Sequence, residues 1–370
     1  MLFSSDLSME CMGISMNKTP YKDLFAGHID LSFKTAASML AAYPASASAF
    51  LRLSKGLKAA ECSRKKLAAE GVEVPALMIV STTDACNLAC AGCYACAQSR
   101  KPADALTDER IAEILDEASG LGVSVVMLAG GEPLLSHGWL DAMSNHPEMA
   151  GIVFTNGTLF DERRLAWFAA HRHIIPTLSI EGGEAQTDAR RGSGVYAKVT
   201  KTMAELRADR IPFGISVTVT SRNIDSILTD DFTQEYIQKG CRLFLFVEYV
   251  PVEAGSEPMV LSKADKKRLR DFTVASEARY PALFIPFPGD EEQFGGCLAA
   301  GRGFVHVSAG GDVEPCPFAP FSDTNLKQVS LKEALTSGFL SRIRENHHLL
   351  KEGDGGCALW NNRAWLETIR

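Results

Sequence analysis

The strongest constraint on the fold is a regular alternation of apolar runs and amphipathic stretches between residues 75 and 249. The apolar runs have the length and composition of strands and lie at 76–81, 123–128, 151–154, 174–180, 213–219 and 242–249. Stretches with helical spacing of apolar residues lie between them, at 108–119, 139–145, 162–170, 196–207 and 225–239. Strands that alternate with helices predict an α/β fold with a parallel sheet and right-handed crossovers.

Chemically distinctive residues follow every one of these predicted strands. In chain order, the carboxyl ends of the strands and the loops after them contain Cys86, Gly130, Asn156, Glu181, Arg222 and Glu248. In parallel sheets and barrels, ligand sites form in the loops after the carboxyl ends of the strands. The sequence therefore predicts one ligand site at this edge of the sheet.

The loop after the first strand carries three cysteines, Cys86, Cys90 and Cys93, at CxxxCxxC spacing. A cubane iron–sulfur cluster normally takes four thiolates, so three leave one iron without a protein ligand. A zinc site or buried structural thiols are the alternatives. Structural zinc usually shows paired CxxC or Cys/His groups, and this loop has no nearby histidine. We therefore favour an iron–sulfur cluster with one open iron.

This motif, followed one strand later by Gly130-Gly131-Glu132-Pro133, resembles the radical S-adenosylmethionine (radical SAM) superfamily over residues 75–260. The resemblance implies an open partial (β/α)6 barrel with a [4Fe–4S] cluster on Cys86, Cys90 and Cys93. It also implies that S-adenosylmethionine chelates the open iron. An electron from the reduced cluster would then cleave the cofactor to a 5'-deoxyadenosyl radical, which abstracts hydrogen from an unactivated carbon of the substrate.

The resemblance further implies roles for residues at the mouth of the barrel. The two glycines permit close approach of the backbone to the cofactor, and Glu132 is a candidate for its ammonium group. Ser179 and Arg191 resemble positions that contact the ribose or the carboxylate, with Arg190 or a solvated arginine pair as alternatives. The expected cofactor-binding residues are Tyr94, Gly130, Gly131, Glu132, Pro133, Asn156, Ser179, Glu181 and Arg191.

The sixth strand ends in the two residues expected to be catalytic, Glu248 and Tyr249. Their position predicts that both point at the cavity, where they bind substrate or move a proton. Two features depart from the family pattern. Gly92 stands where an aromatic or histidine often packs against adenine, with Tyr94 following the third cysteine, and Cys96 is an additional thiol. We interpret Cys96 as a bystander, because its binding would close the open iron.

Three further cysteines, Cys297, Cys316 and Cys357, each stand beside glycine or proline. They resemble the opening half of the SPASM extension of radical SAM enzymes, but the later CxxCxxxxxC is missing. The resemblance implies a shortened, Twitch-like extension with one auxiliary [4Fe–4S] cluster on these three thiols. No fourth ligand is visible in the sequence. The alternative is three buried cysteines at turns.

Charge and composition restrict the partners and the compartment. A net charge of −7 gives no indication of nucleic acid, and ten cysteines in 370 residues are too few for a disulfide scaffold. With no signal peptide and no apolar run of membrane-spanning length, we expect a reducing, anaerobic cytoplasm and a reductant such as ferredoxin or flavodoxin.

Residues 31–69 form a predicted helical pair, broken at Tyr43-Pro44, with seven Lys or Arg residues against Glu61. We favour a solvated basic face that caps the barrel over the alternative of peripheral contact with an anionic membrane.

The expected domains are a helical segment at 1–74, the radical SAM barrel at 75–280 and the auxiliary cluster extension at 281–370. The expected function is radical SAM chemistry on a peptide or protein, with a small molecule, a lipid or an isoprenoid as alternative substrates. A non-catalytic iron–sulfur electron carrier or redox sensor is the rival from another class.

Overall fold

The computed structural model describes residues 39–98, 104–287, 296–350 and 357–370. All six predicted strands are present, each within two residues of its expected bounds. They are β1 (Leu77–Ser81), β2 (Val125–Ala129), β3 (Ala150–Thr155), β4 (Ile174–Ile180), β5 (Gly214–Val219) and β6 (Leu243–Glu248). Each pairs in parallel with the next, in chain order. The prediction of an α/β fold with a parallel sheet is confirmed.

The sheet extends beyond the six strands at both sides. Strand β7 (Leu283–Phe287) pairs in parallel with β6, and β8 (Phe304–Val307) pairs in parallel with β1. Strand β9 (Val313–Glu314) is antiparallel to β8. The sheet is curled, because the ring centroids of Phe287 and Phe304, from strands on opposite flanks, lie 5.5 Å apart. These three strands were not predicted, because they do not alternate with clear amphipathic helices and because β8 and β9 are also short.

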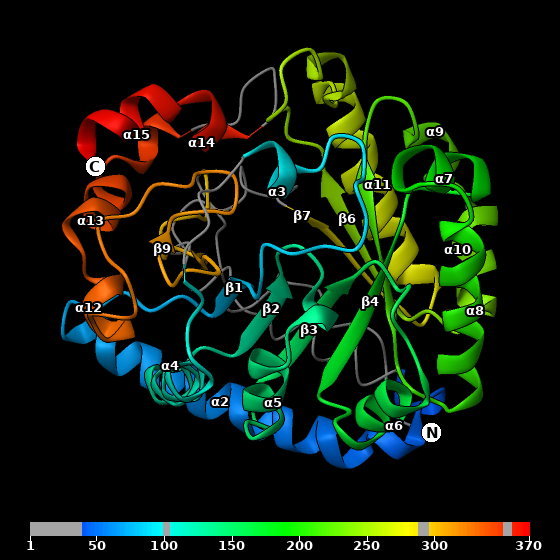
Figure 1. The fold of residues 1–370 in the computed structure, drawn as a ribbon, viewed down its shortest axis with the longest axis horizontal. Coiled ribbons are helices and arrows are strands. Elements are labelled where there is room, and N and C mark those ends of the chain that lie inside the picture. The colour runs from blue at the N-terminus through cyan, green and yellow to red at the C-terminus, as the bar shows by residue number, and fades with distance from the viewer. Residues whose placement is uncertain (1–38, 99–103, 288–295, 351–356) are drawn as a thin grey trace, which may run out of the picture.

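Helices cover the outer face of the curled sheet (Figure 1). Those within the barrel are α4 (Asp108–Leu121), α5 (Gly138–Ser144), α6 (Glu162–Ala170), α7 (Glu184–Arg191), α8 (Val195–Ala208), α9 (Ile224–Ile227), α10 (Asp230–Gln238) and α11 (Lys263–Arg279). The predicted helix at 225–239 is two helices, because Thr229 accepts a hydrogen bond from the Phe232 N–H and so caps a new one. Helix α7 lacks an apolar stripe, with Thr187 as its buried residue, so its periodicity was not visible in the sequence.

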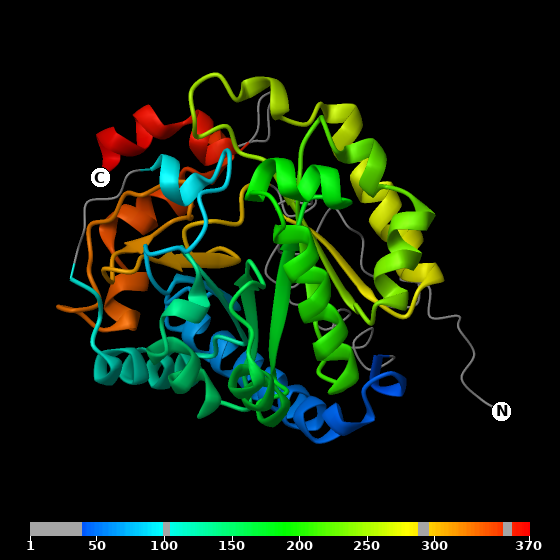
Figure 2. The same ribbon diagram turned by 45° about the vertical axis from the view of Figure 1, so that its right-hand side comes forward.

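Helix α2 (Ala47–Ala69) lies along the edge of the sheet where the strands begin (Figures 1 and 2). Arg64 donates to the Ser124 hydroxyl at 2.8 Å, and Gly56 approaches Glu148 so closely that a Cβ would lie 2.2 Å from its carbonyl oxygen. Lys58, Lys65 and Lys66 are exposed. The helix thus packs on the barrel and turns basic side chains outward. Most of the first predicted helix, at 31–38, lies outside the described residues.

The remaining elements are shorter. Helix α3 (Tyr94–Ala97) follows the cysteine loop, and α12 (Leu331–Leu335), α13 (Gly338–Glu345), α14 (Ala358–Asn361) and α15 (Arg363–Ile369) form the C-terminal part. Single 3₁₀ turns occur at η2 (Met39–Ala41), η3 (Pro44–Ser46), η4 (Pro133–Leu135), η5 (Glu257–Met259) and η7 (His347–Leu349). Within the described ranges, no helix is both long and apolar enough to cross a bilayer.

One hydrophobic core joins the barrel to the C-terminal part. It runs from strand residues such as Val80 and Phe246 through Val305 in β8 to Phe339 and Leu366 in the last helices. The division at residue 280 therefore remains a prediction, and both the sheet and the core continue across it.

Candidate active site at the mouth of the barrel

The cysteine loop lies between β1 and α3, at the edge of the sheet opposite α2 (Figure 1). Burial raises the pKa of the Cys86 thiol, and the nearby Glu132 carboxylate and Cys93 thiol raise it further. Burial also raises the pKa of Cys90, against the lowering effect of Arg191. The structure thus brings the three thiols into mutual electrostatic range. Iron binding favours the thiolate form that these surroundings disfavour.

The glycine pair after β2 packs directly on the backbone of the cysteine loop. A Cβ at Gly131 would lie 2.0 Å from the Ala85 carbonyl oxygen, and one at Gly130 would lie 2.6 Å from that of Thr83. Gly130 also has a φ of +117°. The Gly131 N–H donates to the Thr83 carbonyl at 2.7 Å. Because the two glycines lack Cβ atoms, the loop after β2 can touch the cysteine loop. The close approach of these glycines to a ligand remains a prediction.

Glu132 is buried and joins the loops after β2 and β3. Its Oε1 accepts from the Thr155 hydroxyl at 2.7 Å and the Leu134 N–H at 3.1 Å, and its Oε2 accepts from the Asn156 N–H at 2.8 Å. Burial raises the pKa of this carboxyl, while these donors lower it. Because a carboxylate oxygen has two lone pairs, Oε2 retains capacity for one more donor.

Asn156 extends this network back to the cysteine loop. Its Nδ2 donates to Asn87 Oδ1 at 2.8 Å, and Asn87 Nδ2 donates to the Thr158 hydroxyl at 2.9 Å. Asn87 was not among the predicted site residues, although its place directly after Cys86 in the motif was an available signal. The three strand-end loops thus form one hydrogen-bonded unit.

The end of β4 carries a carboxylate held by two arginines. Glu181 Oε1 accepts from Arg190 Nη1 at 2.7 Å and from Arg191 at 2.9 Å through Nε and 2.5 Å through Nη2. Arg190 also donates to the Ala91 carbonyl in the cysteine loop at 3.1 Å. Neither guanidinium is a freely solvated surface group, since their side chains are 21% and 11% exposed. Ser179, near the end of the same strand, is half-buried.

Glu248 does not point at the cavity, which corrects the expectation from its strand position. Its Oε2 lies 2.9 Å from Lys266 Nζ of α11. Phe246, two residues earlier on the same face, contacts Phe272 of that helix. Side chains alternate between the two faces of a strand, so Glu248 belongs to the helix-facing side and its neighbour to the other. Lys266 had no signal in the sequence that paired it with this carboxylate.

Tyr249 is the residue of this pair that reaches the cysteine loop. It is 4% exposed, and its hydroxyl has no hydrogen-bond partner among the described residues. A Cβ at Gly92 would lie 3.0 Å from this hydroxyl and 3.2 Å from the ring atom Cε2. The Tyr249 ring, which directly follows β6, therefore stands beside the position where the family resemblance led us to expect an aromatic side chain.

Tyr94 and α3 contact the C-terminal part of the chain. The rings of Tyr94 and Phe318 meet edge to face with centroids 5.0 Å apart, and Gln98 Nε2 donates to the Pro317 carbonyl at 2.7 Å. Phe318 and Pro317 directly follow Cys316. The cysteine loop and the C-terminal cysteines are therefore neighbours in space.

The three C-terminal cysteines gather in one group, in which Cys297 and Cys316 are buried and Cys357 is half-buried. The thiols of Cys316 and Cys357 are hydrogen-bonded, and that of Cys297 is close enough to interact with them electrostatically. Burial raises the pKa of Cys316 well above its usual value, and both neighbours add to the rise. The sequence predicted this set, and the fold brings it together from three separate loops.

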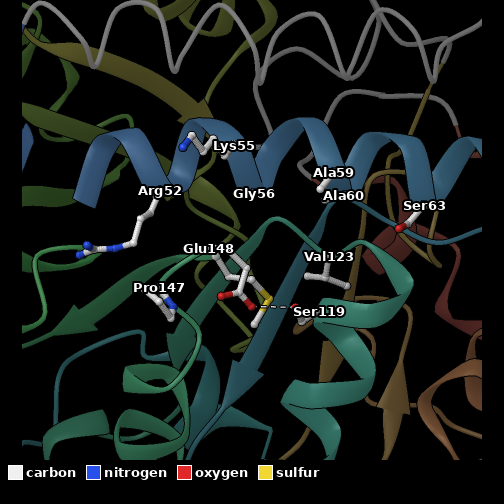
Figure 3. A pocket seen from close by; sticks show the side chains of 11 residues that line it. Arg52, Lys55, Gly56, Ala59, Ala60, Ser63, Ser119, Val123, Pro147 and Glu148 are labelled. Atoms are coloured by element: carbon white, nitrogen blue, oxygen red, sulfur yellow. Dashed lines mark hydrogen bonds between the residues drawn. The ribbon is translucent and has the colours of Figure 1, made fainter. Parts of the chain in front are cut away.

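Among the described residues, no set of three or more His, Cys, Asp or Glu side chains is arranged to hold a metal ion. A cubane cluster distributes three thiolates over three iron atoms, so its ligands stand further apart than those of one ion. A cavity of about 400 Å³ lies away from the cysteines, between α2 and the starts of the strands (Figure 3). Its lining includes Arg52, Gly56 and Glu148.

Fold and cysteine loop together define a radical SAM protein. Residues 80–230 match the model of the radical SAM superfamily, so this part of the chain is a radical SAM domain. The enzyme is of the radical SAM type, whose cofactors are a [4Fe–4S] cluster and S-adenosylmethionine.

Relatives support this class over most of the chain. The AdoMet-dependent heme synthase of Methanosarcina barkeri is 27% identical, with 76% of this chain and 88% of the relative covered. The mycofactocin maturase MftC of Mycobacterium ulcerans is 29% identical, with 76% and 78% covered. Streptococcus suis SuiB bound to S-adenosylmethionine has a TM-score of 0.63 at 20% identity, with 79% and 75% covered, and this likeness confirms the fold.

Proposed function

We propose that this enzyme cleaves S-adenosylmethionine at a cluster bound by Cys86, Cys90 and Cys93, and that it abstracts hydrogen from an unactivated carbon of a peptide or protein. The observation that carries the proposal is the convergence of three thiols with the unpartnered, buried Oε2 of Glu181 at one edge of the sheet. The bound cofactor supplies the radical that takes the hydrogen.

The residues around the cysteine loop suit the functional groups of the cofactor. Glu132 Oε2 can accept from its ammonium group, because this oxygen accepts one hydrogen bond among the described residues. Glu181 Oε2 is buried without a partner there and can accept from the ribose hydroxyls. The apolar ring of Tyr249 beside Gly92 offers a surface for adenine. Arg190 and Arg191 fix Glu181 and so act as positioning residues.

We further propose that Cys297, Cys316 and Cys357 bind an auxiliary [4Fe–4S] cluster. The gathering of these three thiols, two of them buried, supports this assignment. The contact of α3 with the turn after Cys316 provides a short route for electrons between the two sites. A reductant such as ferredoxin or flavodoxin would supply those electrons.

The relatives support a peptide or protein as the substrate class. MftC is named a mycofactocin maturase, and SuiB has been solved with its precursor peptide SuiA. A second candidate is a porphyrin, because Methanosarcina barkeri relatives are named AdoMet-dependent heme synthase and Fe-coproporphyrin III synthase. Incubation of the reduced enzyme with a candidate precursor peptide or with Fe-coproporphyrin III, followed by mass spectrometry of each, separates the two.

The test of the core proposal is 5'-deoxyadenosine formation by anaerobically reconstituted, dithionite-reduced protein. We expect product from the parent and none from the Cys86→Ala/Cys90→Ala/Cys93→Ala variant. If the triple variant retains product formation, these cysteines do not hold the cluster that cleaves the cofactor.

A further inference from the structure

Four thiols gather at the cysteine loop, one more than the cluster motif requires. Cys96 lies in α3, one turn after Cys93, which is the residue that precedes that helix. Its thiol is close enough to those of Cys93, Cys86 and Cys90 to interact with all three. This placement differs from the bystander role expected from the sequence.

Few contacts hold the Cys96 side chain in its present position. Helix α3 is a single turn with no buried residue, and Cys96 itself is exposed. The contacts that anchor the helix come from its neighbours, through Tyr94 to Phe318 and through Gln98 to Pro317. The Cys96 side chain can therefore change rotamer toward the other three thiols without loss of packing.

We propose that the Cys96 thiolate binds the open iron of the cluster while S-adenosylmethionine is absent, and that the cofactor displaces it. The inference rests on the proposed assignment of the cluster to Cys86, Cys90 and Cys93. Three thiolates leave one iron without a protein ligand, and a nearby thiolate is a soft ligand suited to it.

The exchange of ligands involves no electron transfer. Cys96 gives its proton to solvent when its sulfur–iron bond forms. That bond breaks when the amino and carboxylate groups of S-adenosylmethionine take the iron, and the thiolate then regains a proton from solvent. Cys96 thus binds the fourth iron reversibly. It protects the cluster while the cofactor is absent and leaves the iron when S-adenosylmethionine binds.

The test uses the full-length, anaerobically reconstituted protein and its Cys96→Ala variant. Mild oxidation with ferricyanide removes an iron that lacks a strong ligand, and the resulting [3Fe–4S] cluster is counted by electron paramagnetic resonance. The part of the [3Fe–4S] signal that disappears when S-adenosylmethionine is added comes from the cluster to which the cofactor binds. Cys62→Ala is the matched control, because Cys62 is an exposed thiol on α2 at the other edge of the sheet.

Without the cofactor, we expect several-fold more of this signal from Cys96→Ala than from the parent or from Cys62→Ala. With saturating S-adenosylmethionine, all three proteins should give the same low signal. Equal signals from the parent and Cys96→Ala without the cofactor would overturn the proposal, and so would an excess that the cofactor fails to suppress. If the Cys86→Ala/Cys90→Ala/Cys93→Ala variant keeps the suppressible signal, the cluster assignment itself is wrong.

Discussion

Three buried polar atoms at the ends of β4 and β6 have no hydrogen-bond partner among the described residues: Glu181 Oε2, Glu248 Oε1 and the Tyr249 hydroxyl. A buried polar atom left unpaired costs about 1–3 kcal/mol. Glu181 and Tyr249 lie beside the cysteine loop, so a bound ligand can satisfy them. Glu248 lies on the other face, where it is half of an ion pair. At the end of β6, Tyr249 therefore faces the ligand site, while its neighbour Glu248 forms a structural ion pair.

At the residue scale, we predict that Gly131→Ala disrupts the cysteine loop. The new Cβ would lie 2.0 Å from the Ala85 carbonyl oxygen, so one of the two backbones must move. We expect a loss of about 1–3 kcal/mol in the free energy of unfolding and a lower iron content after reconstitution. Urea unfolding and iron analysis measure both effects.

The matched control is Gly120→Ala, in the helix α4. No atom lies within 4 Å of a Cβ at this position, so alanine should stabilise the protein by about 0.5–1 kcal/mol. Equal stabilities and iron contents for the two variants would show that the glycine pair is not needed for contact between the loops.

At the scale of elements, a buried ion pair connects helix α11 to strand β6. Ser262 and Asp265 form a capping box at its first turn, and Lys266 follows on the face that packs on the sheet. The lysine lies 2.9 Å from Glu248, with both side chains less than 10% exposed. A local capping signal therefore begins the helix, and a long-range ion pair fixes its orientation against the strand.

We predict that Lys266→Met destabilises the protein by about 3–5 kcal/mol, because it leaves the buried Glu248 carboxylate without its cation. The control Lys267→Met removes an exposed ion pair with Asp271 and should cost less than about 1 kcal/mol. Denaturant unfolding compares the two.

A double variant, Glu248→Met/Lys266→Met, separates structure from catalysis. It should recover most of the lost stability, since apolar residues replace the whole pair. If it also forms 5'-deoxyadenosine and product at the parental rate, Glu248 is a structural residue. Recovery of stability with loss of turnover would instead support the catalytic role expected from the sequence.

At the scale of the whole molecule, the C-terminal part completes the barrel. Strand β8 pairs with β1, and a buried chain of hydrogen bonds crosses this junction. Ser81 lies 2.9 Å from His306 Nε2, and His306 Nδ1 lies 2.7 Å from Glu314 Oε2. Ser81 leads into the cysteine loop and Glu314 leads to Cys316, so these hydrogen bonds connect the two segments that carry the cysteine groups.

We therefore predict that a chain ending at residue 280 does not fold on its own. It would expose the edges of β1 and β6 to other chains and remove part of the shared core. Circular dichroism should show no cooperative thermal transition, and the truncated protein should aggregate. Supplying residues 281–370 as a separate chain should restore soluble protein. A soluble 1–280 chain with cooperative unfolding would establish the barrel as an independent domain.

The sequence by itself determined the strand and helix alternation, the motif of Cys86, Cys90 and Cys93, and the glycine pair after β2. These features depend on short-range chemistry, namely apolar periodicity, ligand spacing and the absence of a Cβ. Strands β7 to β9 escaped prediction because they are stabilised by their partners more than by their own pattern.

Tertiary structure decided which side chains meet. It paired Glu248 with Lys266, bound Arg190 and Arg191 to one carboxylate, and set Tyr249 against Gly92. It also brought Cys96 to the other three thiols. Each of these depends on contacts between segments or on the face of a strand or helix, and a pattern along the chain specifies a residue's type and spacing but not its partner.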